Sequence, residues 1–382
     1  MTKVRKKWWI LPTIAAFFIY IFITARPITE ETILRPRWIS SLETELPIYI
    51  GNFPNEGFDD IPINISINEQ NMTNDFLPFL LGDRFGYIRD DGTFLLNQRR
   101  TSYVSISSNY WTEYENLPSQ IDIRNPQGNL VLTLEDDSNN TFRSYPIFID
   151  DTILLLDNEQ NSITAINTAG TLLWTYDFPA PITCIDSASG YVLAGTLDGA
   201  IILISPQGRQ VFAPFEPGGS RLSIILGCAI SKDASRIAII SGIDEQRFLL
   251  LERSGDNYRV IYHEFLGEGF RRPVFINFVD NDNRVAFERE GGLGIYDIAS
   301  RISTNLPLSG EVLLMDNSGE DRFLFLVTAS GGIEKRLIGI RYPSSIIIDI
   351  PFRSENVFLS RRENRIFLGG DHSITSFVLD RR

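Results

Sequence analysis

From about residue 33 onward, short apolar runs alternate with polar turn residues along the whole chain. The runs are four to seven residues long, and Gly, Asn, Asp, Ser and Pro separate them. A 3.6-residue periodicity of useful length is absent, so the pattern favours strands over helices. The clearest runs are Tyr103–Ile106, Leu130–Leu134, Ile153–Leu156, Arg236–Ile240, Phe248–Leu251, Val274–Phe278, Arg284–Phe287, Arg322–Val327 and Ser345–Ile350. The sequence therefore predicts an all-β protein.

The most regular stretch lies between Gly170 and Gly208 and contains four such runs. They are Thr171–Tyr176, Ile182–Ile185, Tyr191–Ala194 and Ala200–Ile204. Each has the length of an ordinary strand, and each break carries residues that turn a chain. We interpret this stretch as one four-stranded blade of a β-propeller.

Turns that close the third strand of each unit recur along the chain. They are Asp91-Gly92, Gln127-Gly128, Ala169-Gly170, Gln207-Gly208, Ser254-Gly255, Ala299-Ser300, Tyr342-Pro343 and Asp380-Arg381. The second residues of successive pairs are 36 to 47 positions apart, about 41 on average, which is the period of four-stranded blades. Eight turns predict eight blades. Seven blades are the alternative, because the first two units are irregular.

The last unit ends before its outermost strand. Arg365–Leu368 and Ser373–Leu379 form a hairpin, after which the chain stops. An unpaired outer edge would invite association with other strands. We therefore expect a strand from Thr32–Ile50 to complete the final blade, with Leu46–Ile50 as its most strand-like part.

The N-terminus has a different pattern. Four basic residues within positions 3–7 precede an uncharged run, Trp8–Ala25, that would give roughly 27 Å of helix, close to the thickness of a bilayer core. Small residues at the cleavage positions of a signal peptide are missing, which favours an uncleaved anchor with a cytoplasmic N-terminus. A cleaved signal peptide and a buried soluble helix are the alternatives.

These patterns divide the chain into four parts. We expect a basic cytoplasmic segment at 1–7, a transmembrane helix at 8–25, a juxtamembrane spacer at 26–36 and the propeller at 37–382. Without the four positive charges near the N-terminus, the formal net charge of −13 becomes −17 for the remainder. Such an acidic domain repels nucleic-acid phosphates and anionic lipid, so we expect no nucleic-acid partner.

The two cysteines, Cys184 and Cys228, occupy similar places in consecutive units. The simplest interpretation is two buried apolar side chains. A disulfide between them is the alternative outside the cytoplasm, provided that neighbouring blades bring them close enough.

The central unit resembles the pyrroloquinoline-quinone-like propeller repeat of the broad WD40-like and quinoprotein-like group. The resemblance rests on Ala165-Ile166-Asn167 followed by Gly170 and Trp174, and on the stretch from Val192 to Gly199, Val-Leu-Ala-Gly-Thr-Leu-Asp-Gly. It implies that Trp174 docks one blade on the next. Leu132 and Phe212 take the same place in their own units. Quinone-dependent dehydrogenases of this group use a vicinal cysteine pair and a calcium site, neither of which the sequence provides.

The sequence shows no catalytic, cofactor-binding or metal-binding constellation, and we predict none of these sites. His263 and His372 are the only candidate general bases, and neither lies near a nucleophile motif. Asp280-Asn281-Asp282-Asn283 has the acidic density of a calcium loop but lacks its register, so a polar hairpin is the simpler interpretation. Asn64, Asn71 and Asn139 begin glycosylation sequons.

Function on propellers resides in the loops at the two faces of the ring. We expect a non-catalytic scaffold or adaptor, anchored in the membrane with the propeller outside the cytoplasm, that binds other envelope or membrane proteins. A small-molecule or peptide sensor is the alternative, and an enzyme built from loop carboxylates or a quinone is the third hypothesis. A contiguous apolar patch on one face would favour the adaptor. A pocket with convergent acids of raised pKa would favour ligand binding or catalysis.

Overall fold

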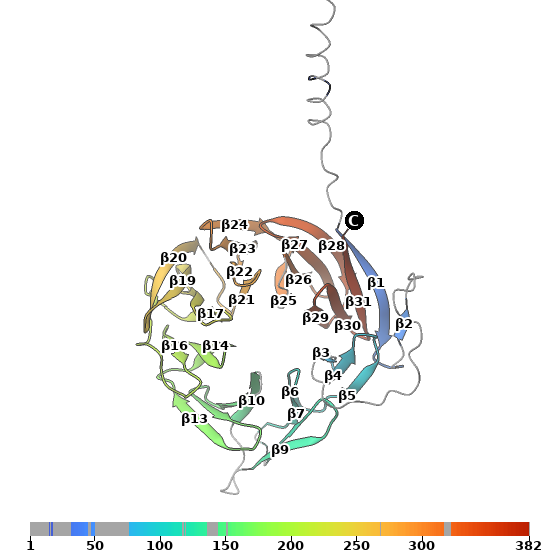
Figure 1. Cartoon of the computed structure of the whole chain (residues 1–382), viewed down its shortest axis with the longest axis horizontal. Coiled ribbons are helices and arrows are strands. Elements are labelled where there is room, and N and C mark those ends of the chain that lie inside the picture. The colour runs from blue at the N-terminus through green and yellow to red at the C-terminus, as the bar shows by residue number, and fades with distance from the viewer. Residues whose placement is uncertain are drawn as a thin grey trace, which may run out of the picture.

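The chain folds into a ring of eight antiparallel sheets (Figure 1). We describe it from a computed structural model, which places residues 15, 17, 32–44, 47–49, 76–116, 118, 120–135, 144–149, 152–267, 269–316 and 322–381. The predictions of an all-β fold and of eight blades are confirmed, and the seven-blade alternative is wrong. Within those residues, no helix has the length and apolarity needed to cross a bilayer. The anchor predicted at 8–25 lies outside the described residues, apart from residues 15 and 17.

The blades are numbered here in chain order. Blade 1 contains β3 (Phe76–Leu81), β4 (Arg84–Arg89) and β5 (Phe94–Arg99), and blade 2 contains β6 (Tyr103–Ile106), β7 (Trp111–Tyr114), β8 (Gln120–Arg124) and β9 (Leu130–Glu135). Blade 3 contains β10 (Ser144–Ile149), β11 (Thr152–Asp157), β12 (Ser162–Ile166) and β13 (Leu172–Asp177). Blade 4 contains β14 (Ile182–Ala188), β15 (Tyr191–Thr196) and β16 (Ile201–Ile204). Blade 5 contains β17 (Ile225–Ile230), β18 (Arg236–Ser241), β19 (Gln246–Ser254) and β20 (Asn257–Gly267). Blade 6 contains β21 (Ile276–Val279), β22 (Arg284–Arg289), β23 (Gly292–Asp297) and β24 (Ile302–Pro307). Blade 7 contains β25 (Glu311–Asp316), β26 (Phe323–Gly331), β27 (Glu334–Arg341) and β28 (Ser345–Arg353). Blade 8 contains β29 (Val357–Arg362), β30 (Arg365–Gly370), β31 (Ser373–Arg381), β1 (Thr32–Ser41) and β2 (Pro47–Tyr49).

The hydrophobic core is divided among the contacts between blades. The buried apolar side chains gather in eight clusters, and each cluster draws its members from two consecutive blades, including the pair formed by blades 8 and 1. Each sheet therefore buries both of its faces against its neighbours. This explains why many strands are continuous apolar runs, such as Ile201–Ile204, all of which is buried.

The ring closes as the sequence predicted, with one correction of detail. β1 pairs antiparallel with β31 from Thr32–Arg381 to Ser41–Ser373, so the N-terminal strand takes the outermost place of the last regular blade. Leu46–Ile50 was the more strand-like candidate, but β2, which lies in it, adds a fifth strand outside β1. β1 also includes residues 32–36, which the sequence analysis assigned to the spacer.

The stretch from Gly170 to Gly208 contains the four predicted strands, but they do not form one blade. β13 pairs with β12 and is the outermost strand of blade 3, whereas β14, β15 and β16 form blade 4. The fourth place of blade 4 is occupied by an irregular segment that bridges to β16 at Gln210 and Phe215. The grouping was wrong because the tight turn at Gly170 joins β12 to β13, while the proline-marked crossing leads to the next blade.

Blade 1 has three strands among the described residues. Arg362, at the end of β29, donates a hydrogen bond of 2.7 Å to the carbonyl oxygen of Phe76, where β3 begins, and Gly82 at the other end lies against Asn356. β3 therefore runs antiparallel to β29, whereas the inner strands β14 and β17 run parallel. Because inner strands of consecutive blades run parallel and β3 runs antiparallel to the inner strand β29, β3 has the direction of a second strand. β4 and β5 then take the third and outermost places of blade 1. The turn at Gly92 is accordingly the turn before an outermost strand, as in the other units.

Side chains of outermost strands dock on these turns in the next blade. A Cβ on Gly208 would collide with Trp174, and one on Gly170 would lie 3.0 Å from Leu132. Phe212 instead stacks near Tyr258 of blade 5, with ring centroids 4.9 Å apart. Trp38 of β1 makes the equivalent contact across the closure, 2.8 Å from a Cβ built on Gly92. The contact implied for Trp174 is present, and Trp38 is a docking residue that the sequence analysis missed.

Substitution of Gly208 by alanine tests the docking contact. Gly208 and Gly255 both have positive φ, +74° and +67°, but only Gly208 faces a neighbour that an added Cβ would meet. We expect Gly255→Ala to cost about 1 kcal/mol from backbone strain alone. Gly208→Ala should cost roughly 2–4 kcal/mol because steric crowding against Trp174 is added. Urea denaturation of the two variants measures the difference, and equal losses would contradict the proposed contact.

A candidate binding site on the connector face

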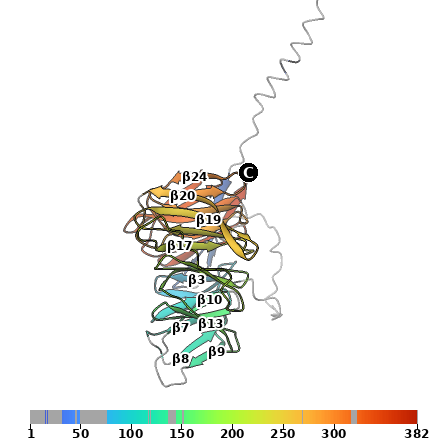
Figure 2. The same cartoon turned by 90° about the vertical axis from the view of Figure 1, so that its left-hand side faces the viewer.

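The two faces of the ring carry different loops. One face, here named the connector face, carries the links between consecutive blades and the turns between the second and third strands. The other, the hairpin face, carries the remaining turns, such as those at Gly170 and Gly208. β1 begins on the hairpin face at Thr32 and ends on the connector face at Ser41, opposite Ser373. Figure 2 shows the ring from its edge, with the C-terminus at the rim.

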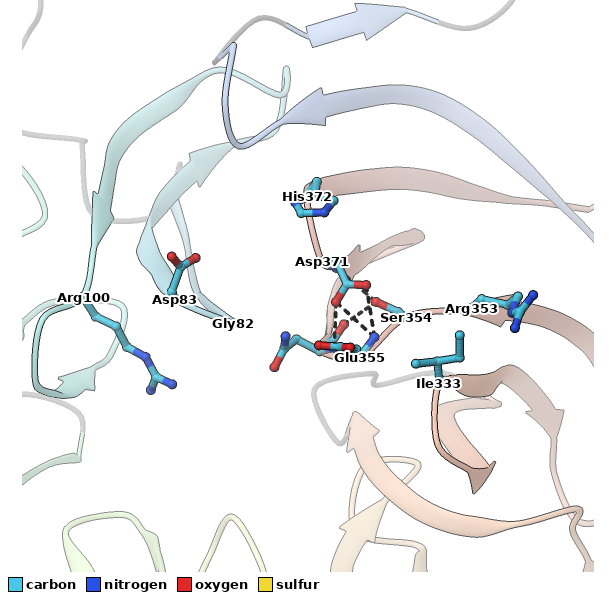
Figure 3. Close-up of a pocket in the computed structure, with 10 residues that line it drawn as sticks. Gly82, Asp83, Arg100, Ile333, Arg353, Ser354, Glu355, Asp371 and His372 are labelled. Carbon is cyan, nitrogen blue, oxygen red and sulfur yellow. Dashed lines mark hydrogen bonds between the residues drawn. The ribbon is translucent and has the colours of Figure 1, made fainter.

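A pocket of about 640 Å³ opens on the connector face where blades 7, 8 and 1 meet (Figure 3). Its position follows from ring closure, which brings loops of blades 7, 8 and 1 together. The lining residues come from five loops and are Gly82, Asp83, Arg100, Ile333, Arg353, Ser354, Glu355, Asn356, Asp371 and His372.

Asp371 organises one wall of this pocket. Its carboxylate accepts hydrogen bonds from the backbone amides of Asn356, at 2.8 Å, and Glu355, at 3.1 Å. Its own amide donates to the hydroxyl of buried Ser354, at 3.0 Å, and that hydroxyl donates to the carbonyl of Asn356. Burial raises the pKa of Asp371, but the amide donors outweigh it and hold the pKa below its ordinary value. The link between β28 and β29 is thus fixed by an ionised side chain.

The opposite wall belongs to blade 1. Asp83 forms an ion pair of 2.6 Å with Arg99, and this hydrogen bond lowers the pKa of the Asp83 carboxyl. Arg100 lies on the same side of the pocket as Asp83 (Figure 3). His372 is exposed at the rim, and its carbonyl oxygen accepts a hydrogen bond from the amide of Leu42.

The electrostatics of the pocket suit recognition of charged groups. A general acid that works near neutral pH needs a raised carboxyl pKa, whereas the pKa values of Asp83 and Asp371 are both lowered. Both carboxylates therefore carry negative charge at neutral pH, beside the guanidinium groups of Arg100 and Arg353. Such a surface favours peptides or ligands with basic groups and hydrogen-bond donors.

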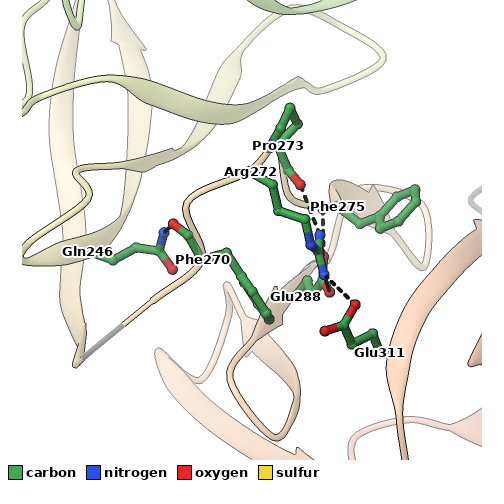
Figure 4. A network of polar contacts seen from close by, with 7 residues as sticks. All are labelled: Gln246, Phe270, Arg272, Pro273, Phe275, Glu288 and Glu311. Carbon is green, nitrogen blue, oxygen red and sulfur yellow. Dashed lines mark hydrogen bonds and ion pairs between the residues drawn. The ribbon is translucent and has the colours of Figure 1, made fainter. Parts of the chain in front are cut away.

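A second polar feature of the connector face joins blades 5, 6 and 7 (Figure 4). Arg272, in the link before β21, contacts both oxygens of Glu288, at 2.7 and 3.1 Å, and lies 3.7 Å from Glu311. Glu288 is only 1% exposed. The ion pair with Glu288 raises the pKa of Arg272. The guanidinium also lies 4.4 Å from the ring centre of Phe270, so one cation joins the link before β21 to β22 and to the start of β25.

Exposed apolar side chains also occur on this face. They are at the ends of strands or in the loops of blades 1, 4, 5 and 7, and are Leu80, Leu197, Leu222, Phe265 and Ile333. Ile333 belongs to the pocket itself. Leu130, Leu172, Ile302 and Ile346 are exposed near the hairpin face, so apolar exposure is not confined to one side. The connector face is distinguished by combining apolar side chains with a pocket and fixed charges.

The residues singled out from the sequence fall in different places. His372 lines the pocket, whereas His263 is exposed on β20. Asp280–Asn283 forms the hairpin between β21 and β22, as predicted, with Asp280 paired to Arg284. In the described part of the chain, no three His, Cys, Asp or Glu side chains form a group suited to a metal ion. Asn64, Asn71 and Asn139 lie outside the described residues.

Fold and pocket together define an eight-bladed propeller with a polar pocket on one face. A family model described as beta-propeller protein matches residues 1–381, and the chain belongs to that family. A protein of Treponema pallidum (strain Nichols), described as uncharacterized, is 26% identical over 374 residues, covering 96% of this chain and 93% of that protein.

Three solved structures share the fold. The computationally designed Ika8 protein is 13% identical, with a TM-score of 0.57, and the match covers 80% of this chain and 96% of that one. BamB from Moraxella catarrhalis is 12% identical, with a TM-score of 0.51 and coverage of 79% and 96%. Apo AztD from Citrobacter koseri is 12% identical, with a TM-score of 0.52 and coverage of 77% and 88%. At these identities the likeness concerns the fold alone.

Proposed function

We propose that this propeller is a non-catalytic scaffold, anchored in the membrane through residues 8–25, that binds another envelope protein through its connector face. The observation that carries the proposal is the coincidence on one face of a pocket with ionised carboxylates and of exposed apolar side chains. Protein interfaces combine apolar contacts with a polar rim. The lowered pKa values of Asp83 and Asp371 favour binding over acid–base catalysis.

The direction of β1 supports an outward-facing site. The strand begins at Thr32, next to the predicted anchor, and its ten residues carry the chain about 30 Å to Ser41. Ser41 pairs with Ser373, two residues after the pocket residue Asp371. An anchor that precedes Thr32 would hold the hairpin face toward the bilayer and leave the pocket accessible to a partner in the periplasm.

The net charge indicates the chemistry of that partner. The chain without its N-terminal basic cluster carries a formal charge of −17. Opposite charge accelerates encounter and suppresses wrong partners. The partner should therefore present basic side chains toward the pocket and apolar ones toward Leu80 and Ile333.

The docking pattern also favours the pyrroloquinoline-quinone-like type of repeat. Trp174 and Leu132 each lie against the turn glycine of the following blade, which is the contact that this resemblance implies. We infer that blades 2 to 4 belong to this repeat type, in a chain that uses the fold without a quinone.

Site-specific photo-crosslinking in intact membranes tests the proposed function. A photoreactive residue at Ile333 or Leu222 should yield an adduct of defined size with one other protein. Ile302, which is 60% exposed near the hairpin face, is the matched control and should give none. Replacement of Asp83 and Glu355 by lysine should lower the adduct yield about tenfold, because two attractive charges become repulsive. Adducts from Ile302 alone, or from no position, would overturn the proposal.

A ligand-binding propeller is the second candidate function. The pocket volume of about 640 Å³ lies within the range of small-molecule sites. Native mass spectrometry of the purified chain separates the two hypotheses. A bound small molecule that is lost on substitution of Arg100 by glutamate, without protein adducts at Ile333, would favour the sensor.

A further inference from the structure

The two cysteines lie together at the junction of blades 4 and 5. Cys184 is on β14 and Cys228 on β17, the inner strands of consecutive blades, and the two thiols are close enough to interact. Both sulfur atoms belong to the same apolar cluster, in which Cys228 is buried and Cys184 is partly buried. The condition that neighbouring blades bring the two cysteines close is therefore met.

The backbone around the cysteines fixes this arrangement. The hydroxyl of Thr183 donates to the carbonyl of Ile225 across the two blades, at 2.6 Å, and the amide of Ile230 donates to the Asp186 carboxylate, at 2.8 Å. One bond thus lies before the cysteine pair and the other after it along both strands. β14 and β17 cannot slide apart without breaking both bonds, so the thiols are held in contact.

We propose that Cys184 and Cys228 are a disulfide site, which links the inner strands of blades 4 and 5 when the chain meets a disulfide oxidant. The oxidant is a small disulfide, such as oxidised glutathione, or a thiol oxidoreductase. The inference is independent of the proposed function, because it concerns the junction of blades 4 and 5 and not the connector face.

The order of the chemical steps follows from exposure. The Cys184 thiolate, which is the more accessible, attacks one sulfur of the oxidant and releases the other as a thiol. The Cys228 thiolate then attacks the Cys184 sulfur of the mixed disulfide and releases the second thiol. The two protein thiols are oxidised, losing two electrons and two protons, and the oxidant disulfide is reduced to two thiols. The interaction with Cys184 and burial raise the pKa of the Cys228 thiol. Burial still does so in the mixed disulfide, which makes the second step slow.

The test uses the folded full-length chain incubated with oxidised glutathione. The product is unfolded, treated with a maleimide and weighed as an intact protein. We expect it to have lost the mass of two hydrogen atoms, to carry no glutathione and to take up no maleimide, whereas the untreated chain takes up two. The melting temperature should rise by roughly 5 °C on oxidation.

Two single variants make the result decisive. Cys228→Ser should retain glutathione on Cys184, because the resolving thiol is gone, and Cys184→Ser should leave Cys228 unmodified and able to take up one maleimide after unfolding. The proposal is overturned if the oxidised wild-type chain still takes up two maleimides, if it retains glutathione as Cys228→Ser does, or if its melting temperature falls.

Discussion

Replacement of Trp38 by alanine will lower the free energy of unfolding by about 3–5 kcal/mol, the cost of emptying a large buried aromatic site. Trp38 is 2% exposed in the closing strand β1. Its ring lies against Gly92 and 6.0 Å from the ring of Phe367, and its indole N–H donates to the carbonyl of Asp90, at 2.9 Å. One side chain therefore joins β1, the rest of blade 8 and the first blade.

Two further variants separate packing from hydrogen bonding at this site. Trp38→Phe keeps an aromatic ring but loses the indole donor, so we expect a smaller loss of about 1–2 kcal/mol. Arg35→Ala, which removes a half-exposed ion pair between β1 and Asp380, should cost less than about 1 kcal/mol. Urea denaturation followed by fluorescence or circular dichroism gives all three values. A Trp38→Ala chain as stable as Arg35→Ala would show that β1 does not hold the ring closed.

The repeat architecture could be predicted because short local sequence patterns mark its turns and strands. A turn before each outermost strand recurs about every forty residues, and the seven such turns, from Gly92 to Pro343, lie as expected in the structure. The eighth position, Asp380-Arg381, is the end of the third strand of the last blade. The apolar runs between them became strands with boundaries close to those predicted; Tyr103–Ile106 is unchanged. Local sequence therefore determines where this chain turns and which segments are extended.

Which strands share a blade was harder to predict. The pairing of β13 with β12 depends on how neighbouring sheets pack and not on any one segment. The closing strand shows the same limit. Leu46–Ile50 has the stronger strand pattern, yet Thr32–Ser41 closes the ring because Trp38 and Ser40 reach the turn at Gly92.

The candidate site could not be predicted, because its residues come together only when the ring of blades closes. Asp83, Ile333 and Asp371 are separated by up to nearly the whole length of the propeller, and each appears in the sequence as an ordinary turn residue. Only the meeting of blades 7, 8 and 1 gives them a common surface. The nearest sequence signal was the Gly-Gly-Asp-His turn at 369–372, interpreted there as a hairpin and found here at the pocket rim.

The buried ion pair on the connector face supports the second large prediction. Arg272→Ala will remove the guanidinium partner of the Glu288 carboxylate, which is 1% exposed in the unchanged chain. Removal of one partner from a buried pair typically costs about 3–5 kcal/mol. Since the Arg272 side chain is 38% exposed and water can partly replace it, we expect a loss of roughly 2–3 kcal/mol.

A double-mutant cycle distinguishes an uncompensated buried charge from a simple loss of packing. Glu288→Gln removes that charge, so Arg272→Ala should cost about 1 kcal/mol or less in the Glu288→Gln background, and the coupling energy should be positive. Arg353→Ala, which removes an exposed pair with Glu334, is the matched control and should change stability by less than about 0.5 kcal/mol. Strictly additive losses would mean that Arg272 acts through its stacking on Phe270 and not through the carboxylate. A positive coupling would instead show that the link between blades 5 and 6 is joined to β22 by charge, at the face where we place the partner.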